Sequence, residues 1–198
     1  KDHNATFEIV RMDTPLEECL RRDALREKPV GSHVIWQMAL QYNLYRPEKG
    51  YVICDIDGTV SDCTWRRHFV RGEGPKDWKS FLDAMGDDEV IVDTAYKVGN
   101  YAREGYDIIF VSARQDGYRA ITEQWLNNNG LGFYKTVLMR RAWDHRDDVD
   151  VKREILDTYF PDKSLVKVVF DDRPKILRLW NECLPDAMIV DCGNGEEF

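Results

Sequence analysis

Residues 51–59, YVICDIDGT, place two carboxylates directly after a short apolar run. The run at 51–54 has the length and the β-branched and aromatic content of a buried strand. Asp55 and Asp57 follow it with one residue between them, and Gly58 then favours a turn. A pair of acids between a buried strand and a turn predicts a polar site at the carboxyl end of a sheet strand.

The rest of the chain beyond residue 50 repeats the alternation of apolar runs and helical segments. Further strands are predicted at 107–112, 136–139, 166–170 and 187–192, and helices near 92–104, 117–129, 151–159 and 174–183. Near-continuous apolar strands that alternate with helices indicate a parallel sheet covered on both faces. We therefore predict an α/β fold with a Rossmann-like parallel sheet, a small lid insertion and a mainly helical N-terminal segment.

The bulk composition narrows the class of protein. The chain has 198 residues, 43% of them hydrophobic, which is enough for one domain and an additional segment. A net charge of -8 argues against a protein that coats nucleic acid nonspecifically. No apolar run approaches the ~20 residues of a membrane span and no signal peptide opens the chain, so we expect a cytoplasmic location without membrane contact. Five cysteines without a C-x-x-C pair favour a reducing compartment over a disulfide framework or a zinc site.

Chemically reactive side chains gather where three of the predicted strands end. They are Asp55 and Asp57, Ser112 and Arg114, and Asp171, Asp172 and Arg173, with Lys152 at the start of the helix before the fourth strand. Carboxylates this close repel one another unless a hard cation lies among them, and Mg2+ prefers carboxylate oxygens together with water and phosphate. One acid can then attack a phosphorus atom while the metal and the lysine neutralise charge, and the other acid can carry the proton. The alternative is a purely polar junction between strand and turn, which the ordered set of acids, serine and lysine disfavours.

This set resembles the haloacid dehalogenase-like (HAD) phosphotransferases, whose motifs run D-x-D-x-T, Ser or Thr, Lys, and paired acids. All four motifs are present in that order. The resemblance implies covalent catalysis through an aspartyl-phosphate, with Asp55 as the nucleophile and Asp57 as the general acid and base. The other implied roles are phosphoryl binding by Ser112 and Lys152, and Mg2+ binding by Asp55, the Asp57 carbonyl and Asp172, with Asp171 in support.

Several stretches after residue 50 are similar to one branch, the 3'-phosphatase domain of phage-type polynucleotide kinase-phosphatases. They are DIDGTVSD with RRHF and GPKDW, VSAR with WL, LMRRAWDHRDDVDVKREI, and FDDRPKILRLW. The resemblance implies a substrate with a 3'-phosphate on a DNA or RNA end, and a location in the host cytoplasm if the chain is phage-encoded. The candidate substrate-binding residues are Arg66, Arg114, Thr59 and Arg146.

Residues 61–89 are inserted between the first strand and the next helix, where a lid would cover the site. Basic and aromatic side chains in this insertion can bind a terminal nucleotide by stacking and by phosphate contacts, with Arg66 as the favoured substrate contact. Two assignments have a plain structural alternative. Trp78 can instead pack a small helix together with Phe81 and Leu82, and Arg146 can be an ion-pair partner of nearby acids.

Residues 1–48 are predicted to be separate from the phosphatase domain at 49–198. A strand at 7–10, an arginine-rich helix and a closing helix resemble the end of the P-loop kinase half of the same bifunctional family. The chain contains no G-x-x-x-x-G-K-[ST] motif, so we expect no kinase activity from it. An unrelated helical extension is the alternative. Because the first residue is Lys1 rather than Met, we expect a piece of a longer protein.

Two other functions are compatible with parts of this pattern. One is a HAD phosphatase for free nucleotides or other small phosphomonoesters, which a closed pocket would favour over an open basic groove. The other is an end-binding module without catalysis, which is disfavoured because binding alone would not need both Asp55 and Asp57. The expected partners are DNA or RNA 3'-phosphate ends, without a membrane, and association of identical copies is left open.

Overall fold

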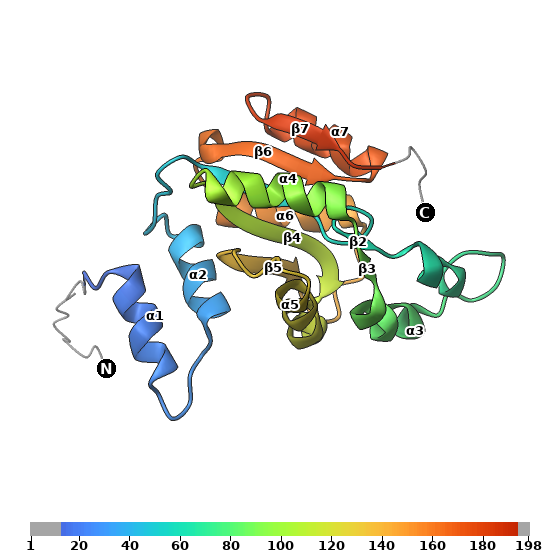
Figure 1. Cartoon of the computed structure of the whole chain (residues 1–198), viewed down its shortest axis with the longest axis horizontal. Coiled ribbons are helices and arrows are strands. Elements are labelled where there is room, and N and C mark those ends of the chain that lie inside the picture. Colours follow the sequence, from blue (N-terminus) through green and yellow to red (C-terminus); the bar gives the residue numbers. More distant parts are fainter. Residues whose placement is uncertain (1–12, 194–198) are drawn as a thin grey trace, which may run out of the picture.

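A five-stranded parallel sheet forms the centre of the molecule (Figure 1). The computed structural model describes residues 13–193. The strands are β1 (Tyr51–Cys54), β4 (Asp107–Gln115), β5 (Thr136–Arg140), β6 (Val166–Asp171) and β7 (Met188–Asp191). They lie in the order β5-β4-β1-β6-β7, and every neighbouring pair is parallel. The predicted parallel sheet is confirmed, with β1 at its centre.

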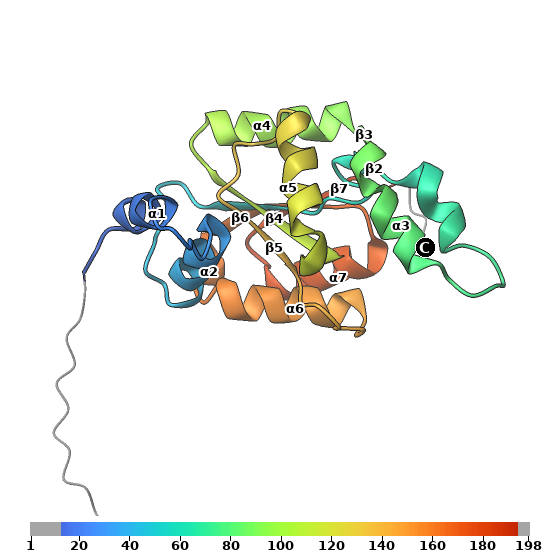
Figure 2. The same ribbon diagram turned by 90° about the horizontal axis from the view of Figure 1, so that it is seen from below.

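Helices cover both faces of this sheet, as expected for strands that are apolar at consecutive positions. Figure 2 shows α4 (Val92–Arg103) and α5 (Arg119–Asn128) on one face, and α6 (Asp148–Tyr159) and α7 (Pro174–Cys183) on the other. Val52 and Cys54 pack with residues of α4 and α5, whereas Ile53 between them packs with residues of α6 and α7. The two hydrophobic cores therefore share β1, which holds the end of that strand rigidly.

Local signals explain where two of the helices begin and end. Gly130 has a φ of 74° just after α5, a left-handed conformation that suits glycine and ends the helix. Asp147 caps α6, because its side chain accepts a hydrogen bond from the Val149 N–H. This cap starts α6 at Asp148, earlier than the predicted 151, and places Lys152 one turn inside the helix.

The predicted insertion forms a small lid, which we define as residues 61–90. It contains β2 (Ser61–Asp62), the 3-10 helix η1 (Thr64–Phe69), α3 (Trp78–Asp83), the 3-10 helix η2 (Ala84–Asp87) and β3 (Glu89–Val90). β2 and β3 pair antiparallel, so the lid leaves and rejoins the main domain at one place. Cys63, Val70 and Phe81 are buried in a separate small cluster that holds the lid together.

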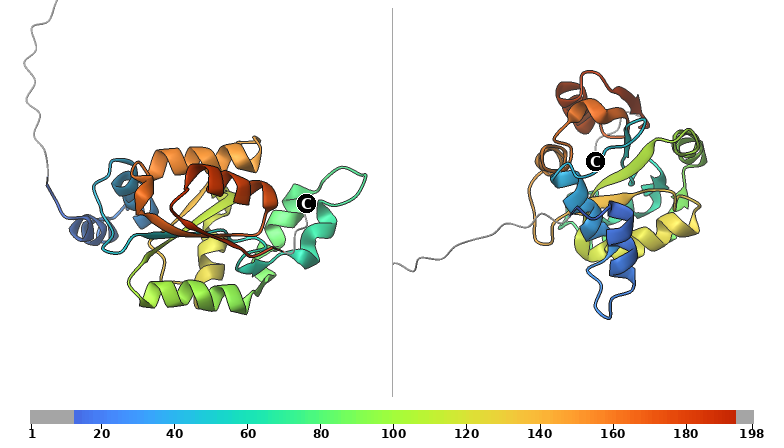
Figure 3. Two further views of the ribbon diagram at one scale, coloured as in Figure 1. Left: turned by 90° about the horizontal axis from the view of Figure 1, so that it is seen from above. Right: turned by 90° about the vertical axis from the view of Figure 1, so that its left-hand side faces the viewer.

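Two helices precede the sheet, α1 (Leu16–Ala24) and α2 (Ser32–Gln41). α2 packs against β5 and α6, and the Tyr45 hydroxyl donates to Asp107 Oδ2 at 2.7 Å, at the start of β4. Figure 3 shows these helices at the end of the molecule opposite the lid. The strand expected at 7–10 lies outside the described residues. Within 13–193, no helix has both the length and the apolar character that crossing a membrane requires.

Candidate active site

The central strand delivers the first acid of the site. Asp55 directly follows β1, and its backbone N–H donates to the carbonyl of Phe170 in β6 at 2.9 Å. Lys152 reaches the same point from α6: its Nζ lies 2.9 Å from Asp55 Oδ1 and 2.7 Å from Asp171 Oδ2. All three charged side chains are buried. Two carboxylates from neighbouring strands therefore share one ammonium group.

Burial and the neighbouring acids disfavour the ionised form of Asp55. Burial raises the pKa of Asp55 to about 8, Lys152 opposes that rise, and Asp171 and Asp172 add to it. Burial by itself lowers the pKa of Lys152, but Asp171 and Asp55 outweigh it and raise the value above the usual range, so the lysine stays charged. Two arginines add positive charge near these acids: Arg67 Nη2 lies 4.0 Å from Asp172 Oδ2, and Arg173 lines the cavity. A cation bound beside Asp55 would further favour its ionised form.

The donor set fits a divalent cation. One carboxylate oxygen from each of Asp55, Asp171 and Asp172 lies within 4.8 Å of the other two. Asp172 Oδ1 is buried and has no hydrogen-bond partner among the described residues. Asp171 is occupied, because Oδ2 accepts from Lys152 and from Trp180 Nε1 while Oδ1 accepts from a backbone N–H. Asp55 and Asp172 are thus the carboxylates best placed to bind a hard cation, with Asp171 in support.

The turn after the first strand is packed directly against this acidic cluster. Gly58 has a φ of 82°, and a Cβ at this position would lie 2.1 Å from Asp172 Oδ2. Only glycine permits both the left-handed conformation and this close approach. The acidic pair on β1 and the paired acids on β6 therefore form one packed unit, although more than a hundred residues separate them.

Asp57 is not part of the acidic cluster found among the described residues and contacts two arginines instead. Arg114 in β4 donates from Nε to Asp57 Oδ2 at 2.8 Å and from Nη2 to Oδ1 at 2.7 Å. Arg66 in the lid donates from Nη2 to the same Oδ1. Burial by itself raises the pKa of Asp57, but Arg114 and then Arg66 outweigh it and hold the pKa well below its usual range. The sheet and the lid together hold Asp57 in its ionised form.

Arg66 lies behind Asp57 and is fully buried, although we expected it to contact substrate. Its Nε donates to Asp88 Oδ1 at 2.7 Å, its Nη2 to Asp88 Oδ2 at 2.6 Å, and its Nη1 to the Phe81 carbonyl at 2.9 Å. Asp88 also accepts from Trp65 Nε1 at 3.0 Å. This geometry makes Arg66 a support for Asp57 that Asp88 holds in place.

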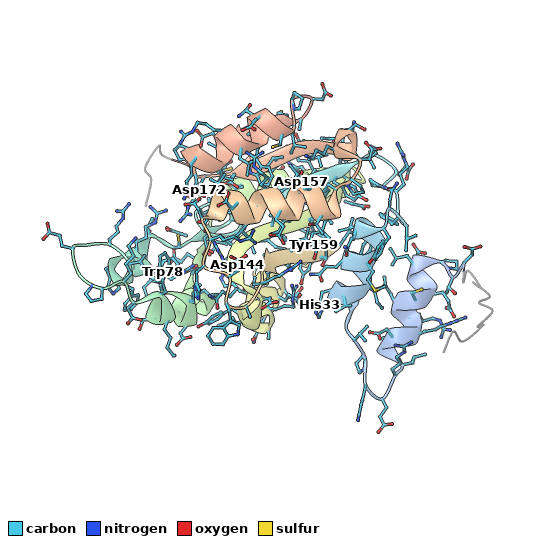
Figure 4. All side chains as sticks on the ribbon, turned by 180° about the vertical axis from the view of Figure 1, so that it is seen from behind. His33, Trp78, Asp144, Asp157, Tyr159 and Asp172 are labelled. Carbon is cyan, nitrogen blue, oxygen red and sulfur yellow. The ribbon has the colours of Figure 1, made fainter. Side chains whose placement is uncertain are left out.

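A cavity of about 390 Å³ lies over the acids. Trp78, Phe81 and Leu82 of the lid line one side, and the loop after β5 contributes Asp144 and neighbouring residues. Figure 4 shows Trp78 and Asp144 close together where the lid approaches this loop. Among the predicted site residues, those lining the cavity are Asp55, Asp57, Arg114, Arg146 and Lys152. Those buried outside its lining are Thr59, Arg66, Ser112, Asp171 and Asp172.

The buried hydroxyls lie close to the cluster without lining the cavity. Ser112 Oγ accepts from the Arg114 N–H at 3.2 Å, so the serine helps to shape the end of β4. Thr59 Oγ1 is buried in the turn after Gly58 and has no hydrogen-bond partner among residues 13–193. The predicted phosphoryl and substrate roles of these two residues stay predictions.

Arg146 combines the two interpretations that the sequence allowed. Its side chain is 49% exposed and lines the cavity, and its Nη2 lies 2.6 Å from Asp144 Oδ2 and pairs with Glu154. Arg140 beneath it is buried and donates to the carbonyls of Ala113 at 2.8 Å and of Arg146 at 2.7 Å. Arg140 therefore attaches the loop to the end of β4, and Arg146 presents charge to the cavity.

Three supporting residues were not predicted from the sequence. Asp148 pairs with both Arg140 and Arg173, Trp180 donates to Asp171 at 3.0 Å, and Asp88 holds Arg66. Asp148 could have been found, because it precedes Lys152 by four residues and must lie on the same face of α6. Asp88 and Trp180 carry no local signal, since their partners come from distant elements.

The chain matches a described protein family over most of its length. The family described as "Polynucleotide kinase PNKP phosphatase domain" matches residues 49–194. This span contains the whole sheet, the four helices that cover it, and the lid. Residues before position 49, with α1 and α2, lie outside the match.

Relatives and solved structures extend this similarity. A predicted bifunctional polynucleotide kinase/RNA ligase of Autographa californica nuclear polyhedrosis virus is 26% identical over 211 residues, covering 99% of this chain and 29% of that protein. A structure of a Pnkp1/Rnl/Hen1 complex aligns with a TM-score of 0.62 and 26% identity over 76% of this chain and 48% of its own. A structure of the Pnkp1/Rnl/Hen1 RNA repair complex shares the fold, with a TM-score of 0.58 and 24% identity over 93% and 64% of the two chains. The chain thus spans under a third of the viral relative and about half of the first structural one.

Proposed function

The chain belongs to the family of polynucleotide kinase phosphatase domains and is a phosphomonoester hydrolase, and from this premise we propose that it is a Mg2+-dependent phosphatase that removes the 3'-phosphate from DNA or RNA ends. One observation carries the mechanism. Asp55, Lys152, Asp171 and Asp172 converge next to a cavity at the carboxyl end of the sheet. Such a rim is where ligands bind in open parallel sheets.

In the first step, an oxygen of Asp55 attacks the phosphorus, forming an Asp55–phosphorus bond while the bond from phosphorus to the 3'-oxygen breaks. The departing 3'-oxygen takes a proton from Asp57. Because Arg114 and Arg66 favour the ionised carboxylate at rest, Asp57 must first take that proton from solvent. In the second step, water attacks the phosphorus, Asp57 takes a proton from that water, and the bond to Asp55 breaks to release inorganic phosphate. The two steps leave Asp55 and Asp57 as they began, as covalent catalysis requires. Lys152 supports Asp55 from 2.9 Å and supplies fixed positive charge throughout.

Asp55 and Asp172, with Asp171 in support, are the residues that would hold the cation. The cation would supply positive charge that keeps Asp55 ionised and neutralises the phosphoryl oxygens. Mg2+ suits this set, because it binds a few carboxylate oxygens and keeps positions for water and phosphate. Arg114 and Arg66 do not compete for this role, since both are directed at Asp57.

A polynucleotide end is the substrate that the surroundings support. The cavity is bordered by an exposed tryptophan of the lid and by Arg146, and its position at the surface leaves room for a chain to continue outward. The relatives are named for polynucleotide kinase, RNA ligase and RNA repair. The alternative is a phosphatase for free nucleotides or other small phosphomonoesters, which the mixed acidic and basic lining also accommodates.

The N-terminal residues enter the proposal separately. We assign 1–48 to the end of a P-loop kinase domain and 49–198 to the phosphatase, and we expect no kinase activity from this chain. We place the reaction in the cytoplasm, that of the host if the chain is phage-encoded. The RNA repair complexes of the structural relatives suggest protein partners as well.

The test compares phosphate release from three substrates in Mg2+: a 3'-phosphorylated oligonucleotide, its 5'-phosphorylated isomer and p-nitrophenyl phosphate. We expect release from the 3' isomer alone, its loss with EDTA, and its return with excess Mg2+. Asp55→Asn should abolish turnover while the circular dichroism spectrum is retained. Turnover of the small ester with both oligonucleotides untouched would keep the mechanism and overturn the substrate, and an active Asp55→Asn protein would overturn the mechanism.

A further inference from the structure

Trp78 begins α3 and is directed at the same cavity as the reacting acids. Its side chain is 48% exposed, yet it lines the cavity with Asp55 and Lys152. Large aromatic side chains at a cavity edge are typical of ligand contact. Of the two lid aromatic side chains that line the cavity, Trp78 and Phe81, Trp78 is the exposed one.

The sequence allowed Trp78 a packing role in the lid helix, but another residue takes that role. Phe81 is 4% exposed and packs with Cys63 and Val70 in the core of the lid, a cluster that does not include Trp78. Trp78 touches Phe81 at right angles, with ring centroids 5.8 Å apart. This contact orients the indole ring and leaves about half of its surface open.

Positive charge accompanies this aromatic surface. Lys76 Nζ lies 5.6 Å from the centre of the Trp78 ring. Arg146 lines the cavity on the side of the loop after β5, where a backbone phosphate would have to compete with its ion-pair partners Asp144 and Glu154. A flat aromatic ring beside cationic groups is the combination that single-stranded nucleic acid uses: the base stacks and the backbone phosphates pair with the charges. A phosphomonoester that has no base and no backbone phosphates would use neither the ring nor these charges.

We propose that Trp78 is the stacking platform for the base of the 3'-terminal nucleotide, so that the site recognises a nucleotide and not the phosphate alone. The proposal rests on the proposed function, because it assumes that the phosphate of a polynucleotide 3' end lies at Asp55. The base of the nucleotide that carries this phosphate then lies between the lid and the loop after β5. Stacking is tolerant of sequence, since every base has a flat face.

The test is a double-mutant-type cycle in which the indole of Trp78, the 3'-terminal base of the substrate, or both are removed. Phosphate release is measured for the unchanged protein and for Trp78→Ala, on a 3'-phosphorylated oligonucleotide and on the same oligonucleotide with an abasic 3'-terminal residue. We expect Trp78→Ala to lower kcat/KM about 10-fold on the normal end and less than about 2-fold on the abasic end. Trp78→Phe, which keeps a flat ring, should recover most of the loss.

A matched control distinguishes base stacking on Trp78 from a nonspecific effect of removing any exposed tryptophan. Trp143 is 86% exposed on the loop after β5 and does not line the cavity, so Trp143→Ala should leave both substrates unaffected. Equal losses on the normal and abasic ends, or no loss on either, would overturn the proposal while the proposed function stands. If the unchanged protein hydrolyses small esters but neither oligonucleotide, the proposed function fails and this proposal fails with it.

Discussion

Asp55 and Asp57 are separated by one residue, yet their surroundings have opposite electrical character. Asp55 faces the sheet side of the site, where Asp171 and Asp172 crowd it and burial raises its pKa. Asp57 lies between the sheet and the lid, where Arg114 of β4 and then Arg66 of the lid lower its pKa. Two identical side chains whose pKa values are driven apart are suited to different roles. In the proposed mechanism, the first acid takes a cation and a phosphoryl group, and the second, held by Arg114 and Arg66, exchanges the proton.

The two sides are also built differently. The sheet side comes from strand ends and from α6, elements that the hydrophobic cores hold rigidly on both faces. The surroundings of Asp57 come from both: Arg114 belongs to β4, whereas Arg66 and the acid that holds it lie inside an insertion with a small core of its own. The comparison teaches that the fold alone builds the site around Asp55, and that the insertion completes the site around Asp57. Three substitutions test that division.

Lys152→Ala should remove the charge pairing around Asp55 and have the largest effect. It leaves Asp55 and Asp171 facing each other without their shared ammonium, so we expect a loss in kcat of at least about 1000-fold. We also expect a lower free energy of unfolding, by about 3 kcal/mol, because a buried charge pair is broken. Activity assays and urea unfolding measure the two effects. Turnover within 10-fold of the unchanged protein would mean that Asp55 does not depend on this lysine.

Asp88→Asn should weaken the lid side without removing any group that lines the cavity. Arg66 would lose a doubly bonded carboxylate partner and hold Asp57 less firmly, so kcat should fall about 10- to 100-fold. KM should change little, because substrate contacts remain. Asp87→Asn is the matched control, since it makes the same change in charge at an exposed neighbour. Similar losses in both variants would show that total charge, and not the contact with Arg66, is responsible.

Trp180→Phe should have the smallest effect and tests how far the hydrogen bond to Asp171 supports the acids at the end of the sheet. It keeps an aromatic ring in the core and removes the hydrogen bond from Nε1 to Asp171 at 3.0 Å. We expect a loss of about 2 kcal/mol in the free energy of unfolding, as for a buried hydrogen bond to a charged group, and a fall in kcat of about 5-fold. Chemical unfolding and steady-state kinetics measure both. An unchanged kcat with lowered stability would show that Trp180 stabilises the core and does not affect catalysis.

Much of this arrangement could be predicted from the chain alone. The strand ends at Asp55, Ser112 and Asp171 follow from apolar runs of strand length, and parallel strands bring their carboxyl ends to one edge. Lys152 follows from its place near the start of a helix. These are local patterns combined with one topological rule, and the structure confirms the sheet that they require.

The rest depends on contacts that no local pattern reports. Asp88 lies in the acidic run GDDE, which is typical of a solvated surface, and only the folded lid buries it against Arg66. Gly58 was expected as a turn residue, but its close approach to Asp172 is visible only when β1 and β6 lie side by side. Burial of Arg66 likewise depends on the path of the whole insertion. Sequence periodicity finds elements, whereas such pairings belong to tertiary structure.

The position of α1 and α2 has a practical consequence for single-molecule work. These helices lie at the end of the molecule away from the lid, and Tyr45 attaches the segment after them to the start of β4. A dye or bead joined ahead of α1 would therefore leave the mouth of the cavity open. The exposed loop at 71–76 is a less suitable position for the same label, because it belongs to the lid and directly precedes α3. Attachment through the N-terminal side is thus the orientation in which binding to a tethered molecule can be observed.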